Sequence, residues 1–446
     1  MSGGGLLMGR RSLTDTLYCS MNGFLVGRLF RRKGRLSFQY EKEWLGLKGS
    51  RPISLSIPLQ SSEITTDSVH AYFDNLLPDS DIVRKHIVDR LGADSLSPFD
   101  LLAAIGGDCI GAISLTVAPP ENAGTEELSL TRLTESGVAE QIKRTRVENT
   151  LGLNEDDDFR ISLAGAQEKT ALTYWNEKWC MPHGMTATTH IFKPPIMHHP
   201  QMALDMSNSV ENEWFCLRFL HHLGFDVAEA DILMFKSQKA LVVKRFDRKV
   251  EKEKERILRL PQEDMCQALG RVSGSKYEEH GGPSSKDIMD TLSRSIMPHE
   301  DRLTFFKTQV AFWLLAAIDG HAKNFSIHLQ ANGFKLCPIY DVMSAYPYFG
   351  QGNIQSKKIK MAMKVHSKNT HYRWYNILGR HWLSHGRYLG LSASAVKQVL
   401  GELLELTEPA LNKALEDAPT AEALSVGETI KARTLSHLAR LDGLAD

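Results

Sequence analysis

The feature that most restricts the fold of this chain is an apolar helix that leads directly into a loop of polar side chains. Residues 305–318 form an all-round apolar pattern, which predicts a helix buried in a large core. The next residues, 319–324 (DGHAKN), bring a carboxylate to this core, and an unpaired carboxylate is costly to bury. A predicted hairpin with an Asn-Gly turn follows at residues 325–339, and Asp341 comes just after it. We therefore expect this loop to carry chemistry.

The spacing of these polar residues is typical of phosphoryl transfer. Protein kinases use an Asp to orient the acceptor hydroxyl, an Asn five positions later for a metal ion, and a second Asp beyond a short hairpin for Mg²⁺. Asp319, Asn324 and Asp341 reproduce this order, this spacing and the hairpin between them. The alternative is a surface loop that merely ends a helix. The coincidence of three features favours kinase chemistry, with Asp319 as catalytic base and Asn324 and Asp341 as Mg²⁺ ligands.

A second segment, residues 162–170 (SLAGAQEKT), has the Lys-Thr ending of a P-loop. A P-loop needs Gly directly before the Lys, and here that residue is Glu168, so a Walker A site is excluded. The small residues predict instead a turn between strands whose backbone N–H groups cover phosphates, with Lys169 or Ser162 nearby. A plain hairpin turn is the alternative.

Residues 189–193 (THIFK) predict a strand that ends in Lys193, about 25 residues after this loop, as the kinase lysine does that holds the α- and β-phosphates. That lysine usually pairs with a helix Glu. A helix follows, capped by Ser207 or Asn208 and ended by Gly224. Glu213 is the candidate partner, and a solvated helix carboxylate is the other reading.

Residues 241–247 (LVVKRFD) predict a strand whose edge would meet adenine through backbone groups. Phe246 stacks on the base in this reading, or packs in the core. Residues 259–267 (RLPQEDMCQ) predict the start of a helix, with Pro261 in its first turn and acidic residues near the positive end of the helix dipole, and we assign them no catalytic role.

The whole chain of 446 residues is long enough for two or three domains. We expect an N-terminal lobe with a β-rich subdomain, a nucleotide-binding part and a helical catalytic lobe, at residues 1–150, 151–260 and 261–446. Beyond residue 262 we expect helices interrupted by one hairpin. The N-terminal lobe is expected to contain hairpins, a further strand and two helices, at residues 17–38, 54–59, 79–91 and 100–105.

Charge and composition exclude a general attraction to nucleic acid, because 53 basic and 53 acidic residues balance. A local basic cluster is interleaved with aromatic residues between positions 357 and 380, and is either a solvated face or a DNA phosphate contact. Its basic members are Lys357, Lys358, Lys360, Lys364, Lys368, Arg373 and Arg380.

Six scattered cysteines predict buried thiols in a reducing compartment. The longest strongly apolar run, residues 310–318, is shorter than the roughly 18 residues of a membrane span. With no signal-peptide pattern near the N-terminus, we expect a cytoplasmic protein.

Several long strings resemble the HipA kinase toxins of bacterial toxin–antitoxin pairs. They are FRISLAGAQEKTAL, THIFK, KRFDR, RLPQEDMCQ, DGHAKNFS and YDVMSAYP, and in the N-terminal part RPISLSIPLQ, FDNLLPDS and PFDLLAAIGGDCIGA. They occur in order from about residue 17 to beyond residue 390, so the resemblance covers most of the chain.

The resemblance implies an α+β, protein-kinase-like fold of the phosphoinositide-kinase-like branch, with a small N-terminal β-rich subdomain and a mainly helical C-terminal lobe. It implies Asp319 as catalytic base, and autophosphorylation of Ser162 as an off-switch. The residues that would meet ATP are Ala164, Gly165, Ala166, Gln167, Glu168, Lys169, Lys193, Lys244, Arg245, Phe246, His321, Asn324, Tyr340 and Asp341, of which Asn324 and Asp341 would hold Mg²⁺.

It also implies a HipB-like helix-turn-helix antitoxin, operator DNA bound through that antitoxin, and an aminoacyl-tRNA synthetase, typically the glutamate enzyme, as substrate. One position departs from the family pattern, because residue 244 is Lys where Glu is expected. Backbone contacts to adenine would tolerate this change, whereas a carboxylate contact would be lost. A silent nucleotide-binding co-repressor and a small-molecule kinase are the two other readings.

Overall fold

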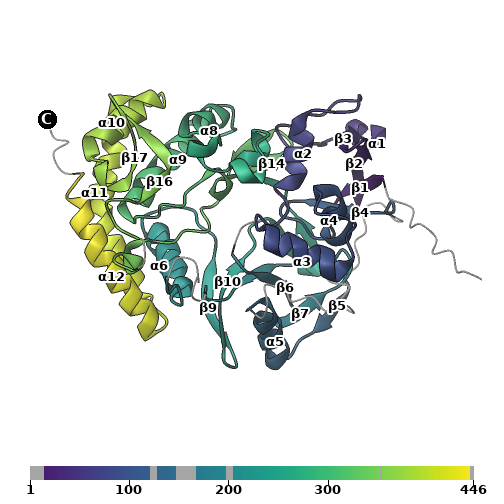
Figure 1. The fold of residues 1–446 in the computed structure, drawn as a ribbon, viewed down its shortest axis with the longest axis horizontal. Coiled ribbons are helices and arrows are strands. Elements are labelled where there is room, and N and C mark those ends of the chain that lie inside the picture. The colour runs from purple at the N-terminus through teal and green to yellow at the C-terminus, as the bar shows by residue number, and fades with distance from the viewer. Residues whose placement is uncertain (1–14, 121–127, 147–166, 197–203, 352–353, 442–446) are drawn as a thin grey trace, which may run out of the picture.

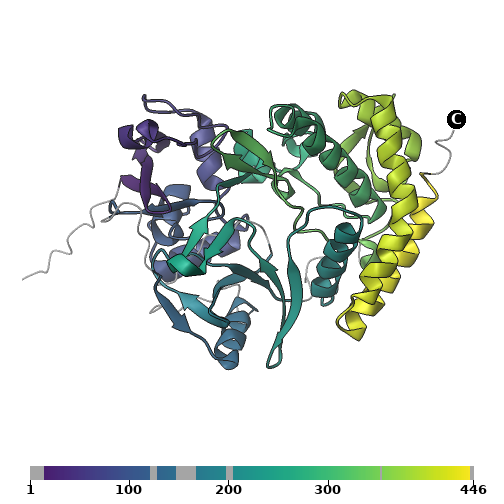
Figure 2. The same cartoon turned by 180° about the vertical axis from the view of Figure 1, so that it is seen from behind.

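The computed structural model describes five stretches of the chain (Figure 1), residues 15–120, 128–146, 167–196, 204–351 and 354–441. Three hydrophobic cores hold them together, one in the N-terminal part, a small one on the central sheet and a large one in the C-terminal part. Figures 1 and 2 show the N-terminal strands and the long C-terminal helices at opposite ends of the molecule. The predicted division at residues 150 and 260 stays a prediction.

The N-terminal part is an antiparallel sheet covered by helices. Its strands lie in the order β3-β2-β1-β4, with the bounds Thr16–Met21 (β1), Phe24–Arg32 (β2), Arg35–Tyr40 (β3) and Ile113–Thr116 (β4). Asn22-Gly23 forms the first turn as predicted, with positive φ angles of 47° and 81°. The helices are α1 (Lys42–Gly46), α2 (Asp67–Asp74), α3 (Asp81–Leu91) and α4 (Pro98–Ile105). The last two confirm the helices predicted there.

The strand predicted at residues 54–59 is wrong, because this segment forms only an isolated bridge between Ser54 and Ile57. It bonds to distant residues instead of a neighbouring strand. The Leu55 N–H donates to Glu263 Oε1 at 2.8 Å, and the Ser56 hydroxyl donates to the Gln267 carbonyl at 2.7 Å. These contacts hold the N-terminal part against the C-terminal part of the chain.

The central sheet is antiparallel and has the strand order β5-β7-β6-β8-β10-β9. Its strands are β5 (Leu130–Arg132), β6 (Thr170–Trp175), β7 (Lys178–Pro182), β8 (His190–Lys193), β9 (Ala230–Phe235) and β10 (Gln238–Lys244). Helices α5 (Glu135–Arg146) and α6 (Ser209–His222) both pack on β9 and β10. Strand β8 and helix α6 confirm the strand predicted to end at Lys193 and the helix predicted to end before Gly224.

The C-terminal part is mainly helical, with α8 (Ser285–Leu292), α9 (Pro298–Leu314), α10 (Gly379–Tyr388), α11 (Ala393–Glu416) and α12 (Ala421–Leu438). Helix α9 is the predicted buried helix, but it begins earlier, with Pro298 in its first turn, and Ala316 at a φ of 50° follows its end. Helices α11 and α12 pack against α6, which in turn packs on β9 and β10 of the central sheet (Figure 2).

Short strands interrupt the C-terminal helices. A three-stranded sheet contains β13 (Gln262–Asp264), β14 (Ser326–Gln330) and β15 (Gly333–Leu336), and the last two are the predicted hairpin. Two further hairpins, β11 (Arg248–Glu251) with β12 (Arg256–Arg259) and β16 (Lys360–His366) with β17 (Thr370–Arg373), complete the strands. The expectation of one hairpin beyond residue 262 is therefore wrong, since β16–β17 is a second one.

All six cysteines are buried and free, as predicted. In the part of the chain that the structure describes, no helix combines the length and the apolar character needed to cross a membrane.

Candidate active site

A cavity of about 910 Å³ opens among the N-terminal part, the central sheet and the C-terminal helices. Every predicted site residue that the structure describes lines this cavity. They are Gln167, Glu168, Lys169, Lys193, Lys244, Arg245, Phe246, Asp319, His321, Asn324, Tyr340 and Asp341. Ser162, Ala164, Gly165 and Ala166 lie outside the described residues.

The centre of the site is an ion cluster around Lys193. This residue ends β8, a strand paired on both sides, so its backbone position is fixed. Its Nζ atom lies 2.7 Å from Glu213 Oε1 on α6 and 2.7 Å from Asp341 Oδ1. The side chain of Glu213 is only 2% exposed, so the reading as a solvated helix carboxylate is wrong.

The charges in this cluster stabilise one another. Burial alone would lower the pKa of Lys193, but the carboxylates of Asp341 and Glu213 outweigh burial and raise it above its usual range. Burial likewise opposes ionisation of Asp341, yet the neighbouring ammonium groups of Lys193 and Lys169 hold its pKa well below its usual range. Both groups therefore carry their charges at neutral pH.

Asp341 is held in an unusual backbone conformation, with a φ of 59° in the left-handed region. The chain just before it is fixed by a parallel bridge between Ile339 and Val227, beyond the end of α6. The Asn324 side-chain amide donates to Asp341 Oδ2 at 3.3 Å. Carboxylate and amide oxygens are hard donors of the kind that Mg²⁺ takes together with phosphate oxygens, so the two residues fit such an ion.

The loop after α9 carries the remaining polar groups. Its shape is fixed by the backbone N–H of His321, which donates to the Asp319 carbonyl at 2.7 Å and to Asn324 Oδ1 at 3.1 Å. The Asp319 side chain is 72% exposed, and Asp319 lines the cavity. His321 is buried, and burial lowers its pKa, so its ring is neutral at physiological pH.

Two aromatic rings also line the cavity. The rings of Phe246 and Tyr340 have centroids 5.6 Å apart, and His328 packs edge-on to Phe246 at 5.7 Å. The Tyr340 hydroxyl donates to the Lys323 carbonyl at 2.6 Å, which ties this ring to the loop after α9. Phe246 is half-buried against the large core, so core packing and contact with a base are compatible.

The side chains of Lys244 and Arg245 are occupied elsewhere. Lys244 is exposed, and its Nζ lies 2.8 Å from Glu229 Oε2. The guanidinium of Arg245 is buried and bonded to Asp247 at 2.7 Å and Asp108 at 3.2 Å. Their backbone N–H groups are bonded as well, that of Lys244 to the Glu229 carbonyl at 2.8 Å and that of Arg245 to the Thr189 carbonyl at 2.9 Å. Contact of adenine with this edge, and tolerance of Lys in place of Glu at position 244, stay predictions.

Lys169 brings a second ammonium group to the cavity. Burial and the nearby charge of Lys193 lower its pKa to about 8, while Asp341 and Asp79 act in the opposite direction. Lys169 and Lys193 both lie near the Asp341 carboxylate. Two neighbouring ammonium groups suit a polyanionic ligand such as a phosphate chain.

Several residues of the cavity lining were not predicted. Lys323 is buried, and its Nζ lies 2.7 Å from Asn75 Oδ1 and 3.2 Å from Asp264 Oδ2. The helix start predicted at Pro261 is wrong, because residues 262–264 form β13 and pair with β14, and Asp264 then caps α7 (Met265–Ala268). Asp264 and Asn75 are far from the loop in sequence, so no local pattern marks them as its partners.

Two family models match the chain, the HipA N-terminal domain at residues 17–116 and the HipA-like C-terminal domain at residues 161–411. Y4mE of Sinorhizobium fredii, a protein named as a candidate kinase, is 31% identical over 403 residues, which are 89% of this chain and 91% of that protein. The serine/threonine-protein kinase toxin HipA of Shewanella oneidensis is 30% identical over 350 residues, 75% of this chain and 76% of that protein.

The fold is similar to that of Shewanella oneidensis HipA, solved in complex with HipB and operator DNA. The TM-score is 0.78 at 24% identity, over 96% of this chain and 98% of that chain. This likeness confirms the predicted kinase-like α+β fold. Because the C-terminal model alone matches more than half of the residues, and the N-terminal model matches about half of the rest, the chain belongs to the HipA family.

Proposed function

We propose that this protein is an ATP-dependent serine/threonine protein kinase and the toxin of a HipA/HipB-type toxin–antitoxin pair. The observation that carries the proposal is the Lys193 ammonium, 2.7 Å from both Glu213 and Asp341 in a cavity of about 910 Å³. A lysine that is paired with a helix glutamate and lies next to a metal-binding aspartate is the arrangement by which kinases hold ATP phosphates. A nucleotide fits a cavity of this size.

Each group has a role in this proposal. Lys193 holds the α- and β-phosphates of ATP, Lys169 and the loop before it hold the outer phosphates, and the base lies by Phe246 and Tyr340. Asn324 and Asp341 hold Mg²⁺, which when bound neutralises charge on the phosphates. Asp319 accepts the proton of the acceptor hydroxyl as the phosphoryl group is transferred.

The partners follow from the family. We expect a HipB-like helix-turn-helix antitoxin and operator DNA bound through it, as in the Shewanella oneidensis complex of HipA, HipB and operator DNA. The expected substrate is an aminoacyl-tRNA synthetase, the glutamate enzyme by resemblance, whose phosphorylation would stop translation in the bacterial cytosol. The protein would then be partly associated with the nucleoid through its antitoxin.

The test is transfer of labelled γ-phosphate from magnesium-ATP to a protein in a bacterial lysate. The expected result is one labelled protein of synthetase size, modified at Ser or Thr, and growth arrest on expression without the antitoxin. Tight ATP binding with no transfer to any lysate protein would favour a silent co-repressor instead.

Autophosphorylation of Ser162 should inactivate the protein. Ser162 lies outside the described residues, but it is followed closely by Gln167 and Lys169, which line the cavity. A phosphate adds roughly −1.5 to −2 charges, which would compete with ATP for the lysines of the cavity. Mass spectrometry after incubation with magnesium-ATP should find the phosphate at Ser162, together with loss of ATP binding in calorimetry. Ser162→Ala should lack the modification, whereas Ser394→Ala, an exposed serine of α11, should keep it; unchanged ATP affinity of the phosphorylated form contradicts the switch.

Exposed lysines next to β16 should contribute to operator binding by the complex with the antitoxin. Two lysines of the basic cluster lie next to acidic residues. The Nζ of Lys360 is 2.5 Å from Glu279, and the Nζ of Lys364 is 3.0 Å from Glu278. Replacing Lys357, Lys358 and Lys360 with Ala should weaken operator binding and lower the slope of log affinity against log salt by about 1 for each lost phosphate contact. Electrophoretic mobility shifts at several salt concentrations measure this.

The matched control replaces three exposed lysines elsewhere, Lys33, Lys85 and Lys178. If both triple variants give the wild-type salt slope, the basic cluster is a solvated face.

A further inference from the structure

The carboxylate of Asp319 receives a hydrogen bond from a residue that lies outside the kinase motifs. The hydroxyl of Tyr277 donates to Asp319 Oδ1 at 2.6 Å. Among the described residues this is the only hydrogen bond to that carboxylate, and the nearest ring nitrogen of His321 lies 4.0 Å from Oδ2. A carboxylate that is 72% exposed has little packing to fix its rotamer, so this bond decides where it points.

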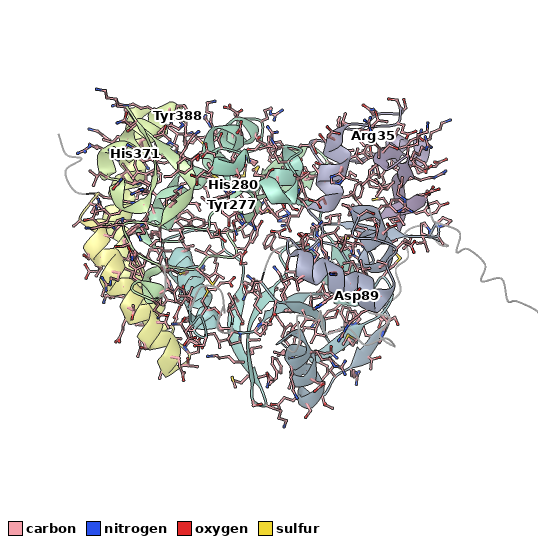
Figure 3. All side chains as sticks on the ribbon, in the orientation of Figure 1. Arg35, Asp89, Tyr277, His280, His371 and Tyr388 are labelled. Atoms are coloured by element: carbon pink, nitrogen blue, oxygen red, sulfur yellow. The ribbon has the colours of Figure 1, made fainter. Side chains whose placement is uncertain are left out.

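Tyr277 is itself firmly placed (Figure 3, centre). Its ring packs edge-on to His321 at 5.1 Å and to His280 at 5.9 Å. The Gly282 N–H closes the loop by donating to the Tyr277 carbonyl at 2.9 Å. This turn requires glycine at position 282, because a Cβ atom there would lie 2.3 Å from the Ser275 carbonyl oxygen.

The N-terminal part of the chain holds the same loop. The Nζ of Lys276 lies 2.8 Å from Oδ2 of Asp79, and the Lys276 carbonyl accepts from the Ala322 N–H at 3.3 Å. Asp79 also lies 3.7 Å from the Nζ of Lys323, within the loop that follows Asp319. Tyr277 is therefore anchored to the N-terminal part and to the catalytic loop at once.

We propose that Tyr277 is a positioning residue for Asp319, which turns Oδ2 of the carboxylate toward the acceptor hydroxyl. The proposal rests on the proposed kinase function of the same site. Burial and the charge of Asp319 both raise the pKa of Tyr277 above its usual range, so the phenol stays protonated and remains a donor across the neutral range. Tyr277 acts on phosphoryl transfer only through its hydrogen bond to Asp319, and we assign it no contact with the nucleotide or the acceptor.

The test is Tyr277→Phe, which keeps the ring between its two histidines and removes only the hydroxyl. Tyr388→Phe is the matched control, because Tyr388 is an exposed tyrosine on α10, far from Tyr277 in Figure 3, with its ring stacked on His366. Phosphoryl transfer to dephosphorylated casein, ATP affinity by calorimetry and the thermal midpoint are measured for both, and a crystal structure is determined for Tyr277→Phe.

We expect kcat of Tyr277→Phe to fall roughly tenfold to a hundredfold, as for loss of a hydrogen bond to a charged group, at unchanged ATP affinity and thermal midpoint. The Asp319 carboxylate should leave its wild-type orientation in the crystal, and Tyr388→Phe should match the wild type. A kcat within twofold of the wild type overturns the proposal. So does a joint fall of kcat, ATP affinity and thermal midpoint, which marks a structural role. If the wild type transfers phosphate neither to casein nor to any lysate protein, the kinase proposal fails, while the crystal structure still decides whether Tyr277 positions Asp319.

Discussion

Asp319→Ala should lower the rate of phosphoryl transfer by roughly 10²- to 10⁴-fold, the contribution typical of a general base. ATP affinity should stay within about twofold of the wild type, because the groups proposed to hold the nucleotide are Lys193, Asn324 and Asp341. The Asp319 side chain is 72% exposed, so its removal should change the free energy of unfolding by less than about 0.5 kcal/mol. Label transfer from γ-labelled ATP, calorimetric titration and urea unfolding measure the three quantities. Growth arrest on expression should disappear with the activity.

Asp89→Ala is the matched control for this change, because Asp89 is an exposed carboxylate on α3 that does not line the cavity, and Figure 3 shows it well apart from Tyr277. It should behave as the wild type in all three measurements. Kinase activity retained by Asp319→Ala would contradict the role of Asp319 as base. A large loss of ATP affinity would instead place Asp319 among the nucleotide ligands.

The parts of the site that could be predicted from the sequence are those fixed by neighbours along the chain. Asp319 and Asn324 lie on one loop, and the hairpin of β14 and β15 returns the chain to Asp341, so spacing alone suggests that the three meet. The apolar run of residues 189–193 predicts the strand that ends in Lys193. The polar residue before α6, Ser207 or Asn208, and Gly224 after it predict where that helix begins and ends. The sequence alone does not decide whether Lys193 pairs with Glu213, because the face of the helix that packs against the strand is not known before the fold is known.

The contacts that were missed join segments far apart in the sequence. Residues 54–57 bond to Glu263 and Gln267, about 210 positions later, through the Leu55 N–H and the Ser56 hydroxyl, so a strand pattern of alternating apolar residues gave the wrong answer there. Lys323 is charged and lies in a polar loop, yet it is buried by Asn75 and Asp264. Burial of a charge depends on partners brought by the tertiary fold, and local composition does not report them.

Lys193→Met should both destabilise the protein and abolish ATP binding. The side chain of Glu213 is 2% exposed, so removing the ammonium group leaves a buried carboxylate without its cation. Breaking a buried ion pair by removal of one partner costs about 3–5 kcal/mol. Asp341 should suffer less from the same loss, because its side chain is 39% exposed and water can replace the lysine. Urea unfolding at neutral pH measures the loss of stability.

A second substitution separates this structural effect from the proposed nucleotide contact. In Lys193→Met with Glu213→Gln, the buried position is occupied by a neutral amide that needs no counter-charge, so most of the lost stability should return. ATP affinity should not return, because the ammonium group proposed to hold the α- and β-phosphates is still absent. If stability stays low in the double variant, the unpaired Glu213 is not its cause. If the double variant binds magnesium-ATP as tightly as the wild type, Lys193 acts only as a structural cation between α6 and Asp341, and the phosphates must be held by Lys169 and the loop before it.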